Sequence, residues 1–92
     1  MRATIQFRGQ LATATGQSEA ERDLAPGDTL SSLIAALADE HGEAFREIVF
    51  DSEGRQRRTL LVAIDGEQVV DFESPISDGA REITLMPPIA GG

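Results

Sequence analysis

The chain has 92 residues, with eight basic and sixteen acidic side chains and a formal net charge of −8 at pH 7. Every one of the eight basic residues is arginine, so the chain contains no lysine. This length supports one domain, and a hydrophobic fraction of 40% is enough for a small core but too little to enclose a large pocket. The excess of acidic residues argues against nucleic-acid binding. No apolar run approaches the roughly 20 residues of a membrane span. The absence of cysteine excludes disulfides, thiolate metal ligands and a cysteine nucleophile.

The first part of the chain predicts two strands that pair as a hairpin. Residues 3–8 alternate between apolar and polar side chains, as in a strand with one buried face. Residues 18–24 alternate weakly and are highly charged, which is typical of an edge strand facing water. Gly9 and Gly16 bracket the connection. The N-terminus shows no charged region followed by an apolar stretch, so we expect no secretory signal and a cytoplasmic protein.

An amphipathic helix is predicted to follow the break at 26–29. Asp28 or Thr29 is expected to cap its first turn, and Gly42 to end it. The helix is then about 13 residues long, or roughly 20 Å. A lone helix of this kind must lie across a sheet to bury its apolar stripe. The stripe consists of Leu30, Leu33, Ile34, Leu37 and Ala38.

The second half of the chain predicts three further strands. Residues 43–50 are ambiguous, since they suit either a short helical turn or the approach to a strand. The apolar run 60–64 is typical of a strand covered on both faces. Asp65-Gly66 is a strong two-residue hairpin signal, and 67–72 would return as the partner strand. Residues 81–86 alternate again and form the last predicted strand.

Several polar residues could have a functional role, but a structural role is expected for each of them. His41 lies in the last helical turn, where a capping or surface role is expected rather than metal binding or catalysis. Residues 51–54 are interpreted as a turn and not as a calcium loop, because the glycine and the later glutamate are misplaced. A solvated loop or strand edge is the better interpretation of the nearby arginines, Arg55, Arg57 and Arg58, than a partner contact.

The order of elements predicts an α+β fold of the β-grasp, or ubiquitin-like, type. One main helix separates the first hairpin from the later strands, so it acts as a crossover that allows mixed strand pairing. The expected architecture is a mixed four- to five-stranded sheet with one main helix packed across it. A ferredoxin-like split arrangement is the alternative, but it requires a second full helix, for which 43–50 looks too short.

The chain ends in an unusual tail. We expect residues 1–86 to form the single domain and residues 87–92 to form an extended flexible tail, which can reach at most about 20 Å. Pro87 and Pro88 fix φ and stiffen the stalk, whereas Gly91 and Gly92 carry no Cβ and fit a narrow channel. Terminal glycines alone are a weak motif; directly after the last strand of a β-grasp chain and behind Pro-Pro-Ile-Ala they are a strong one.

Taken together, these features resemble the MoaD/ThiS family of ubiquitin-like sulfur carriers over essentially the whole chain. The resemblance rests on the element order, the Pro-Gly-Asp-Thr-Leu helix start, the hairpin at 64–67, the Asp78-Gly79 turn and the ending 86–92. It implies a carrier with no catalytic residues of its own. An adenylating enzyme of the ubiquitin-activating type uses ATP to activate the C-terminal carboxylate, and a sulfur donor then displaces AMP and leaves a thiocarboxylate.

Carried onto this chain, the resemblance implies that Gly92 is the activated residue and Gly91 the second threaded one. The partner-binding part of the tail would be Pro87, Pro88, Ile89 and Ala90. The chain itself is expected to bind no cofactor or metal, since the activating enzyme uses the ATP. Its partners would be that enzyme, the sulfur donor and an acceptor enzyme, with neither nucleic acid nor membrane among them.

The ending and the length favour the small subunit of molybdopterin synthase, whose large subunit would accept the sulfur. Segment 43–58 departs from a minimal carrier and leaves other members open: carriers for thiamine, cysteine or tRNA thiolation pathways, ubiquitin-like protein modifiers, and a binding module whose tail is never activated. In such carriers the sheet face away from the helix often docks the activating enzyme. Phe7, Leu60 and Val62 are candidates for that face, although the apolar run does not decide which alternate set points outward.

Overall fold

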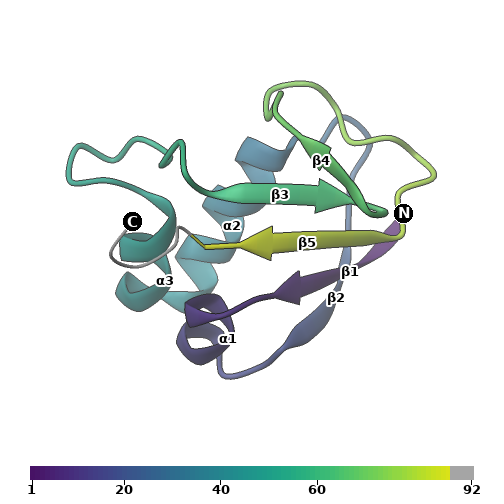
Figure 1. Ribbon diagram of the computed structural model, residues 1–92. Coiled ribbons are helices and arrows are strands. Elements are labelled where there is room, and N and C mark those ends of the chain that lie inside the picture. The colour runs from purple at the N-terminus through teal and green to yellow at the C-terminus, as the bar shows by residue number, and fades with distance from the viewer. Residues whose placement is uncertain (88–92) are drawn as a thin grey trace.

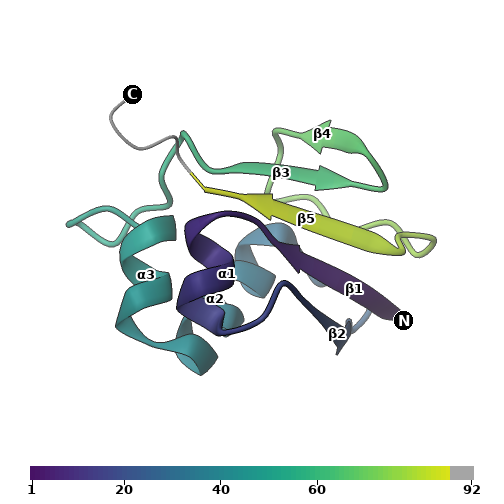
Figure 2. The same cartoon turned by 60° about the horizontal axis from the view of Figure 1, so that its bottom comes forward.

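The computed structural model describes residues 1–87, which form five strands and three helices (Figure 1). In chain order these are β1 (Arg2–Phe7), α1 (Gln10–Thr15), β2 (Glu19–Asp23), α2 (Leu30–His41), α3 (Glu43–Val49), β3 (Leu61–Ile64), β4 (Glu67–Val69) and β5 (Glu82–Met86). The strands make one sheet in the order β2-β1-β5-β3-β4, and the helices lie on one side of it (Figure 2). The predicted α+β, β-grasp fold is confirmed.

The sheet is mixed, as predicted from the single crossover. β1 pairs antiparallel with β2 and parallel with β5, while β3 pairs antiparallel with both β5 and β4. The last strand in the sequence is therefore the central strand in space. This places the start of the C-terminal tail at the middle of one end of the sheet.

The core forms where the strand alternation meets the helical stripe. Ala3, Ile5 and Phe7 of β1 are at most 2% exposed, and Ile83 and Leu85 of β5 are completely buried. All five residues of the predicted stripe on α2 are buried as well. Each fully buried aliphatic side chain stabilises the fold by about 1.5–3 kcal/mol, so this shared interface holds the single domain together.

Helix α2 begins and ends as its sequence predicts. The Thr29 hydroxyl accepts a hydrogen bond from the Ser32 N–H (3.1 Å), and the Ser32 hydroxyl accepts one from the Thr29 N–H (2.9 Å). Thr29 is thus the cap, while the Asp28 carboxylate accepts from the Ala25 N–H instead. Gly42 ends the helix at a φ of +84°, a conformation that favours glycine.

Two short helices complete the fold: α1 was not predicted, and α3 is one of the two alternatives that the sequence left open. The connection between β1 and β2 is the six-residue α1, whose Leu11 is completely buried. Segment 43–50, left ambiguous by its sequence, forms α3 and buries Phe45 and Val49. Helices this short are marginal by themselves, so their stability comes from packing that a local pattern does not record.

His41 joins this packing instead of lying free on the surface. Its ring is half-buried, with centroids 5.9 Å from the Phe7 ring and 5.8 Å from the Phe45 ring. Phe7 and Phe45 also meet edge to face at 6.3 Å. The expectation of a capping or surface role is therefore only partly correct, because the imidazole belongs to an aromatic cluster that joins β1, α2 and α3.

The returning strand and the outward face of β3 differ from the prediction. β4 ends at Val69 and not at residue 72. Leu61 is 43% exposed, so the strand is not covered on both faces. Phe7, Leu60 and Val62 were candidates for the outward face, and all three are at most 3% exposed and belong to the core. The register explains this, because Val62 lies opposite the buried Leu85 while Leu61 lies opposite Met86.

The predicted turns form. Asp65 and Gly66 have φ values of +50° and +88° and join β3 to β4. The Asp51 carboxylate accepts hydrogen bonds from the Glu53 and Arg55 N–H groups, which makes 51–54 a turn. Within residues 1–87, no helix is long and apolar enough to cross a membrane.

Candidate functional site

The sequence predicted the C-terminal tail as the working part of the molecule. Pro88, Ile89, Ala90, Gly91 and Gly92 lie outside the described residues, and Pro87 is the last residue inside them. The described part of the site is therefore the tail root, Met86 and Pro87, together with the surfaces around it.

The tail root is held from both sides by the sheet. The Arg8 N–H donates a hydrogen bond to the Leu85 carbonyl oxygen (3.1 Å), which continues the β1–β5 ladder to its end. On the other side, Leu61 lies opposite Met86 in the β3–β5 register. Because the tail follows a central strand and not a free edge, its starting point is fixed relative to the whole domain (Figure 1).

Gly9 lets the backbone pass close to Pro87. A Cβ placed on Gly9 would lie 3.3 Å from the Pro87 Cγ, which is tighter than ordinary van der Waals contact. The φ of Gly9 is +52°, which L-residues with side chains rarely adopt. The sequence indicated Gly9 only as one of two glycines that bracket the connection after the first strand. Its contact with a residue 78 positions later became visible only in the fold.

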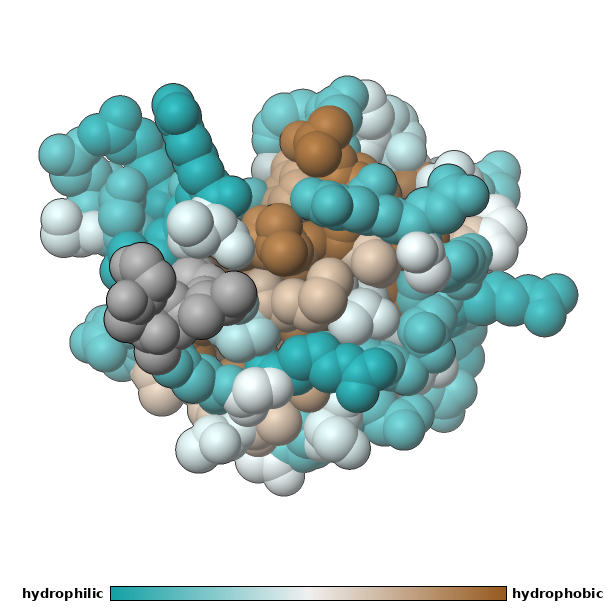
Figure 3. Space-filling model, in the orientation of Figure 1, coloured by the Kyte–Doolittle hydropathy of each residue, from teal (hydrophilic) through white to brown (hydrophobic). Residues whose placement is uncertain are grey.

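An apolar patch, made of Leu61, Val70 and Met86, lies on the sheet face opposite the helices and includes the first residue of the tail root. Leu61 is 43% and Val70 85% exposed, and Met86 is half-buried. Figure 3 shows the apolar atoms of this face gathered over the β3–β4 side. The far edge of the same face carries the exposed carboxylates of Glu19, Glu21 and Asp23 on β2. The face is thus divided into an apolar half near the tail and an acidic half away from it.

A chain of polar side chains lies between these halves. The Arg8 guanidinium donates to the Gln6 side-chain oxygen (2.6 Å), and the Gln6 amide donates to the Glu82 carboxylate (2.8 Å). These contacts hold Arg8 along β1, close to the tail root. The Gln6 amide also satisfies one acceptor oxygen of Glu82 on the central strand.

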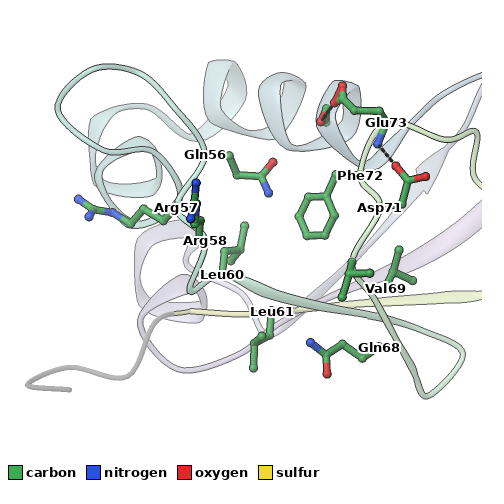
Figure 4. A pocket seen from close by; sticks show the side chains of 12 residues that line it. Gln56, Arg57, Arg58, Leu60, Leu61, Gln68, Val69, Asp71, Phe72 and Glu73 are labelled. Atoms are coloured by element: carbon green, nitrogen blue, oxygen red, sulfur yellow. Dashed lines mark hydrogen bonds between the residues drawn. The ribbon is translucent and has the colours of Figure 1, made fainter.

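A groove opens where β3 and β4 separate, and we call it the fork groove (Figure 4). The β3–β4 pairing ends at Val62 and Val69, and the segments on either side, 56–60 and 70–73, diverge around a space of about 480 Å³. Figure 4 shows Phe72 between the two walls. The groove is lined by Ser31, Gln56, Arg57, Arg58, Leu60, Leu61, Gln68, Val69, Val70, Asp71, Phe72 and Glu73.

The acidic wall of the fork groove is satisfied within the domain. The Asp71 carboxylate accepts hydrogen bonds from the Ser74 hydroxyl and the Glu73 N–H, and these bonds lower the pKa of Asp71 below its ordinary value of 3.8. The Ser31 hydroxyl donates to the Glu73 carboxylate, and the Ser31 N–H donates to the Phe72 carbonyl oxygen (3.0 Å). These bonds attach the wall to the start of α2.

The polar side chains of residues 1–87 form no metal-binding cluster. No three histidine, aspartate or glutamate side chains in this range gather closely enough to hold a metal ion. No buried polar side-chain atom of this range lacks a hydrogen-bond partner, and its only histidine packs against aromatic rings. What the arrangement does provide is a rigid exit for a tail beside an apolar surface.

Comparison with known proteins agrees with this arrangement. A protein-family model described as the ThiS family matches residues 5–92. The match therefore covers almost the entire chain, including the tail that lies outside the described residues. No curated protein sequence matches the chain.

Solved structures of the same fold come from several organisms. SAMP1 from Haloferax volcanii is 24% identical, with a TM-score of 0.82 and complete coverage of both chains. A putative molybdopterin converting factor, subunit 1, from Pyrococcus furiosus is 23% identical, with a TM-score of 0.73 and coverage of 97% of this chain and 99% of that one. A complex of subunits 1 and 2 of the molybdopterin-converting factor from Helicobacter pylori contains a chain that is 21% identical, with a TM-score of 0.57 and complete coverage of both.

Proposed function

The chain belongs to the ThiS family and has the ubiquitin-like fold of its sulfur carriers, and from this premise we propose that it carries sulfur as a thiocarboxylate on Gly92. The observation that carries the proposal is the family match, which runs through the last residue of the chain. The rigid tail root on the central strand supports it, because a carrier must hold its tail at a defined point while a partner works on the end.

The chemistry explains why two glycines suit this end. A carboxylate is a poor electrophile because its leaving group would be oxide. In the activation step a carboxylate oxygen of Gly92 attacks the α-phosphorus of ATP and pyrophosphate leaves. A sulfur nucleophile then attacks the carbonyl carbon and AMP leaves, so that a C–S bond replaces the C–O bond. Side chains beside that carbonyl would obstruct the channel, and glycine has none.

In this proposal the chain is a carrier and not a catalyst. ATP and the catalytic groups belong to an adenylating enzyme of the ubiquitin-activating type, and the chain itself binds no cofactor. Both enzyme and carrier would work in the cytoplasm. The tail segment Pro87, Pro88, Ile89 and Ala90 would span the channel, and the apolar patch would rest on the surface around its entrance. The exposure of Leu61 and Val70, and the position of Leu61 opposite Met86, support that use of the patch.

The acceptor that we propose is the large subunit of a molybdopterin synthase. Support comes from the Pyrococcus furiosus and Helicobacter pylori structures, which are described as subunits of a molybdopterin converting factor. The Helicobacter pylori structure is a complex of subunits 1 and 2, so a chain of this fold has a partner subunit there.

A protein modifier is the second candidate. It is favoured by the likeness to the small archaeal modifier protein of Haloferax volcanii, which extends over the full length of both chains. In that case the activated Gly92 would be transferred to an amine of another protein, with an isopeptide bond in place of the thiocarboxylate.

The first test is activation of the tail. ATP–pyrophosphate exchange by the adenylating enzyme of the same organism should depend on the intact chain. Gly92→Ala should lower the exchange about 100-fold or more, because its Cβ adds bulk and restricts φ in a narrow channel. Deletion of Gly91 and Gly92 should abolish it. Thermal unfolding of both variants should match the unaltered protein, since Gly91 and Gly92 have no side chain to bury.

The second test follows the sulfur. After a sulfur donor is added, the peptide that contains Gly92 should gain the mass of one oxygen-to-sulfur exchange. Transfer of that sulfur to a dithiolene precursor by a molybdopterin synthase large subunit would support the first candidate. An isopeptide bond from Gly92 in a digest of cellular protein would support the second. A carboxylate that stays unmodified, with no exchange, would rule out both.

A further inference from the structure

All eight arginines lie within residues 1–87, and in that range four form ion pairs and four do not: Arg8, Arg57, Arg58 and Arg81. The four that form ion pairs with carboxylates are Arg2, Arg22, Arg46 and Arg55. Arg57 and Arg58 form no ion pair in that part of the chain, and both are exposed and line the fork groove. On a chain with a net charge of −8, two neighbouring guanidiniums without carboxylate partners are a local exception to the overall charge.

The fold positions Arg57 and leaves the outer N–H donors of its guanidinium available. The Arg57 N–H donates to the Val49 carbonyl oxygen (2.8 Å), and its Nε donates to the Glu47 carbonyl oxygen (3.2 Å). The C-terminal end of α3 therefore holds the backbone and the inner part of this side chain. The outer nitrogens of the fork-shaped guanidinium remain free to bind a carboxylate with two parallel hydrogen bonds.

Within residues 1–87, the carboxylates of the opposite wall form no ion pair with Arg57 or Arg58. Asp71 accepts from Ser74 and Glu73, and Glu73 accepts from Ser31, so both carboxylates are engaged within their own wall. The half-buried Phe72 lies toward the space between the walls and supplies an apolar surface (Figure 4). The groove thus combines a half-buried aromatic ring, a basic wall without ion pairs and an opposite wall whose carboxylates are hydrogen-bonded within the domain.

The basic wall is continuous with the tail root. Leu61 lines the groove and also lies opposite Met86, the last residue of the central strand. Any protein that takes the tail into its active site must approach this end of the sheet. The groove is therefore next to the entrance of that active site.

We propose that the fork groove receives an acidic segment of the adenylating enzyme at the rim of its active site. Carboxylates of that segment would pair with Arg57 and Arg58, and an apolar side chain would rest on Phe72. The inference builds on the proposed function, because insertion of the tail is what brings the two surfaces together. The groove would add affinity and orientation, and it would leave the chemistry at Gly92 unchanged.

Charge reversal tests this inference against a matched control. Arg58→Glu and Arg81→Glu change the net charge equally, and both arginines are exposed and without an ion pair within residues 1–87. Arg81 precedes β5 and so lies at the end of that strand away from the tail root. In ATP–pyrophosphate exchange with the adenylating enzyme of the same organism, Arg58→Glu should raise the KM for the carrier about tenfold without changing kcat. Arg81→Glu should change KM less than about twofold.

Salt and a neutral variant sharpen the test. Raising the salt concentration to about 0.5 M should reduce the difference between the two variants, because screening weakens charge pairs at a rim. Arg57→Ala and Arg58→Ala should each raise KM by less than the reversal does. Unchanged thermal unfolding would show that the variants fold, which is expected for exposed side chains.

The outcomes separate the two proposals. No exchange with the unaltered protein would overturn the proposed function. Exchange with the unaltered protein, and equal KM values for Arg58→Glu and Arg81→Glu, would overturn the fork-groove inference alone. A fall in kcat at constant KM would also contradict it. A third contrary outcome is that the carrier self-associates and that Arg58→Glu abolishes this association without changing KM. The occupant of the fork groove would then be a second copy of the chain.

Discussion

At the scale of single residues, Gly9 shows most clearly how the fold restricts the choice of amino acid. Its φ of +52° and ψ of −127° form a combination that a side chain disfavours, and its missing Cβ leaves room for Pro87. The glycine therefore serves both the end of β1 and the start of the tail. A local sequence pattern indicates the turn after β1. It does not indicate the contact with Pro87, which lies far away in the chain.

Gly9→Ala should destabilise the protein by about 1–3 kcal/mol, the usual cost of forcing a side chain into such a conformation. Urea unfolding would measure the change. Gly79→Ala is the matched control, because Gly79 has no positive φ and nothing lies within 4 Å of a Cβ placed there. Equal stability of the two variants would mean that neither the backbone of Gly9 nor its contact with Pro87 carries strain.

At the scale of elements, helix α3 packs on the core and supports one wall of the fork groove. Its sequence, with Phe45, Ile48 and Val49, suits either a helix or a strand. Packing resolves the choice, because Phe45 meets the rings of Phe7 and His41. The same helix then positions Arg57 through the Val49 and Glu47 carbonyl groups. An ambiguous segment of sequence thus becomes the support of one wall of the fork groove.

Phe45→Ala should lower the free energy of unfolding by about 3–5 kcal/mol, because it leaves a cavity where a completely buried ring was. Glu47→Ala on the exposed side of the same helix should change it by less than about 0.5 kcal/mol. Chemical denaturation of both variants provides the comparison. A small effect of Phe45→Ala would contradict the docking of α3 on the core.

At the scale of the whole molecule, charge acts in two opposing ways. A net charge of −8 on 92 residues favours unfolding through self-repulsion. Ion pairs such as Arg2–Asp23 and Arg46–Asp39 oppose it, but these side chains are exposed and each pair contributes at most about 1 kcal/mol. We expect the repulsion to be the larger effect near neutral pH.

Sodium chloride should therefore raise the Tm at pH 7 as it screens the repulsion. The rise should disappear near pH 4.4, the isoelectric point of the chain, where little net charge remains to be screened. Thermal unfolding followed by circular dichroism at both pH values would show this. A Tm that falls with added salt at pH 7 would indicate that the ion pairs outweigh the repulsion.

The sequence by itself determined the elements whose pattern is local. The alternation in β1 and β5 and the stripe on α2 each repeat within a few residues, and Thr29, Gly42 and Asp65-Gly66 act on their immediate neighbours. These signals were enough to predict the α+β, β-grasp fold. The family resemblance likewise rested on the order of the elements and on short motifs of neighbouring residues.

Only the tertiary structure decided which residues form the surfaces around the tail. The run of apolar residues from Leu60 to Ile64 contains no alternation, so its outward face depended on the register with β5. The contact of Gly9 with Pro87 and the two walls of the fork groove join segments far apart in the chain. A local pattern holds no record of such pairs, because they become neighbours only after the central strand has been placed between β1 and β3.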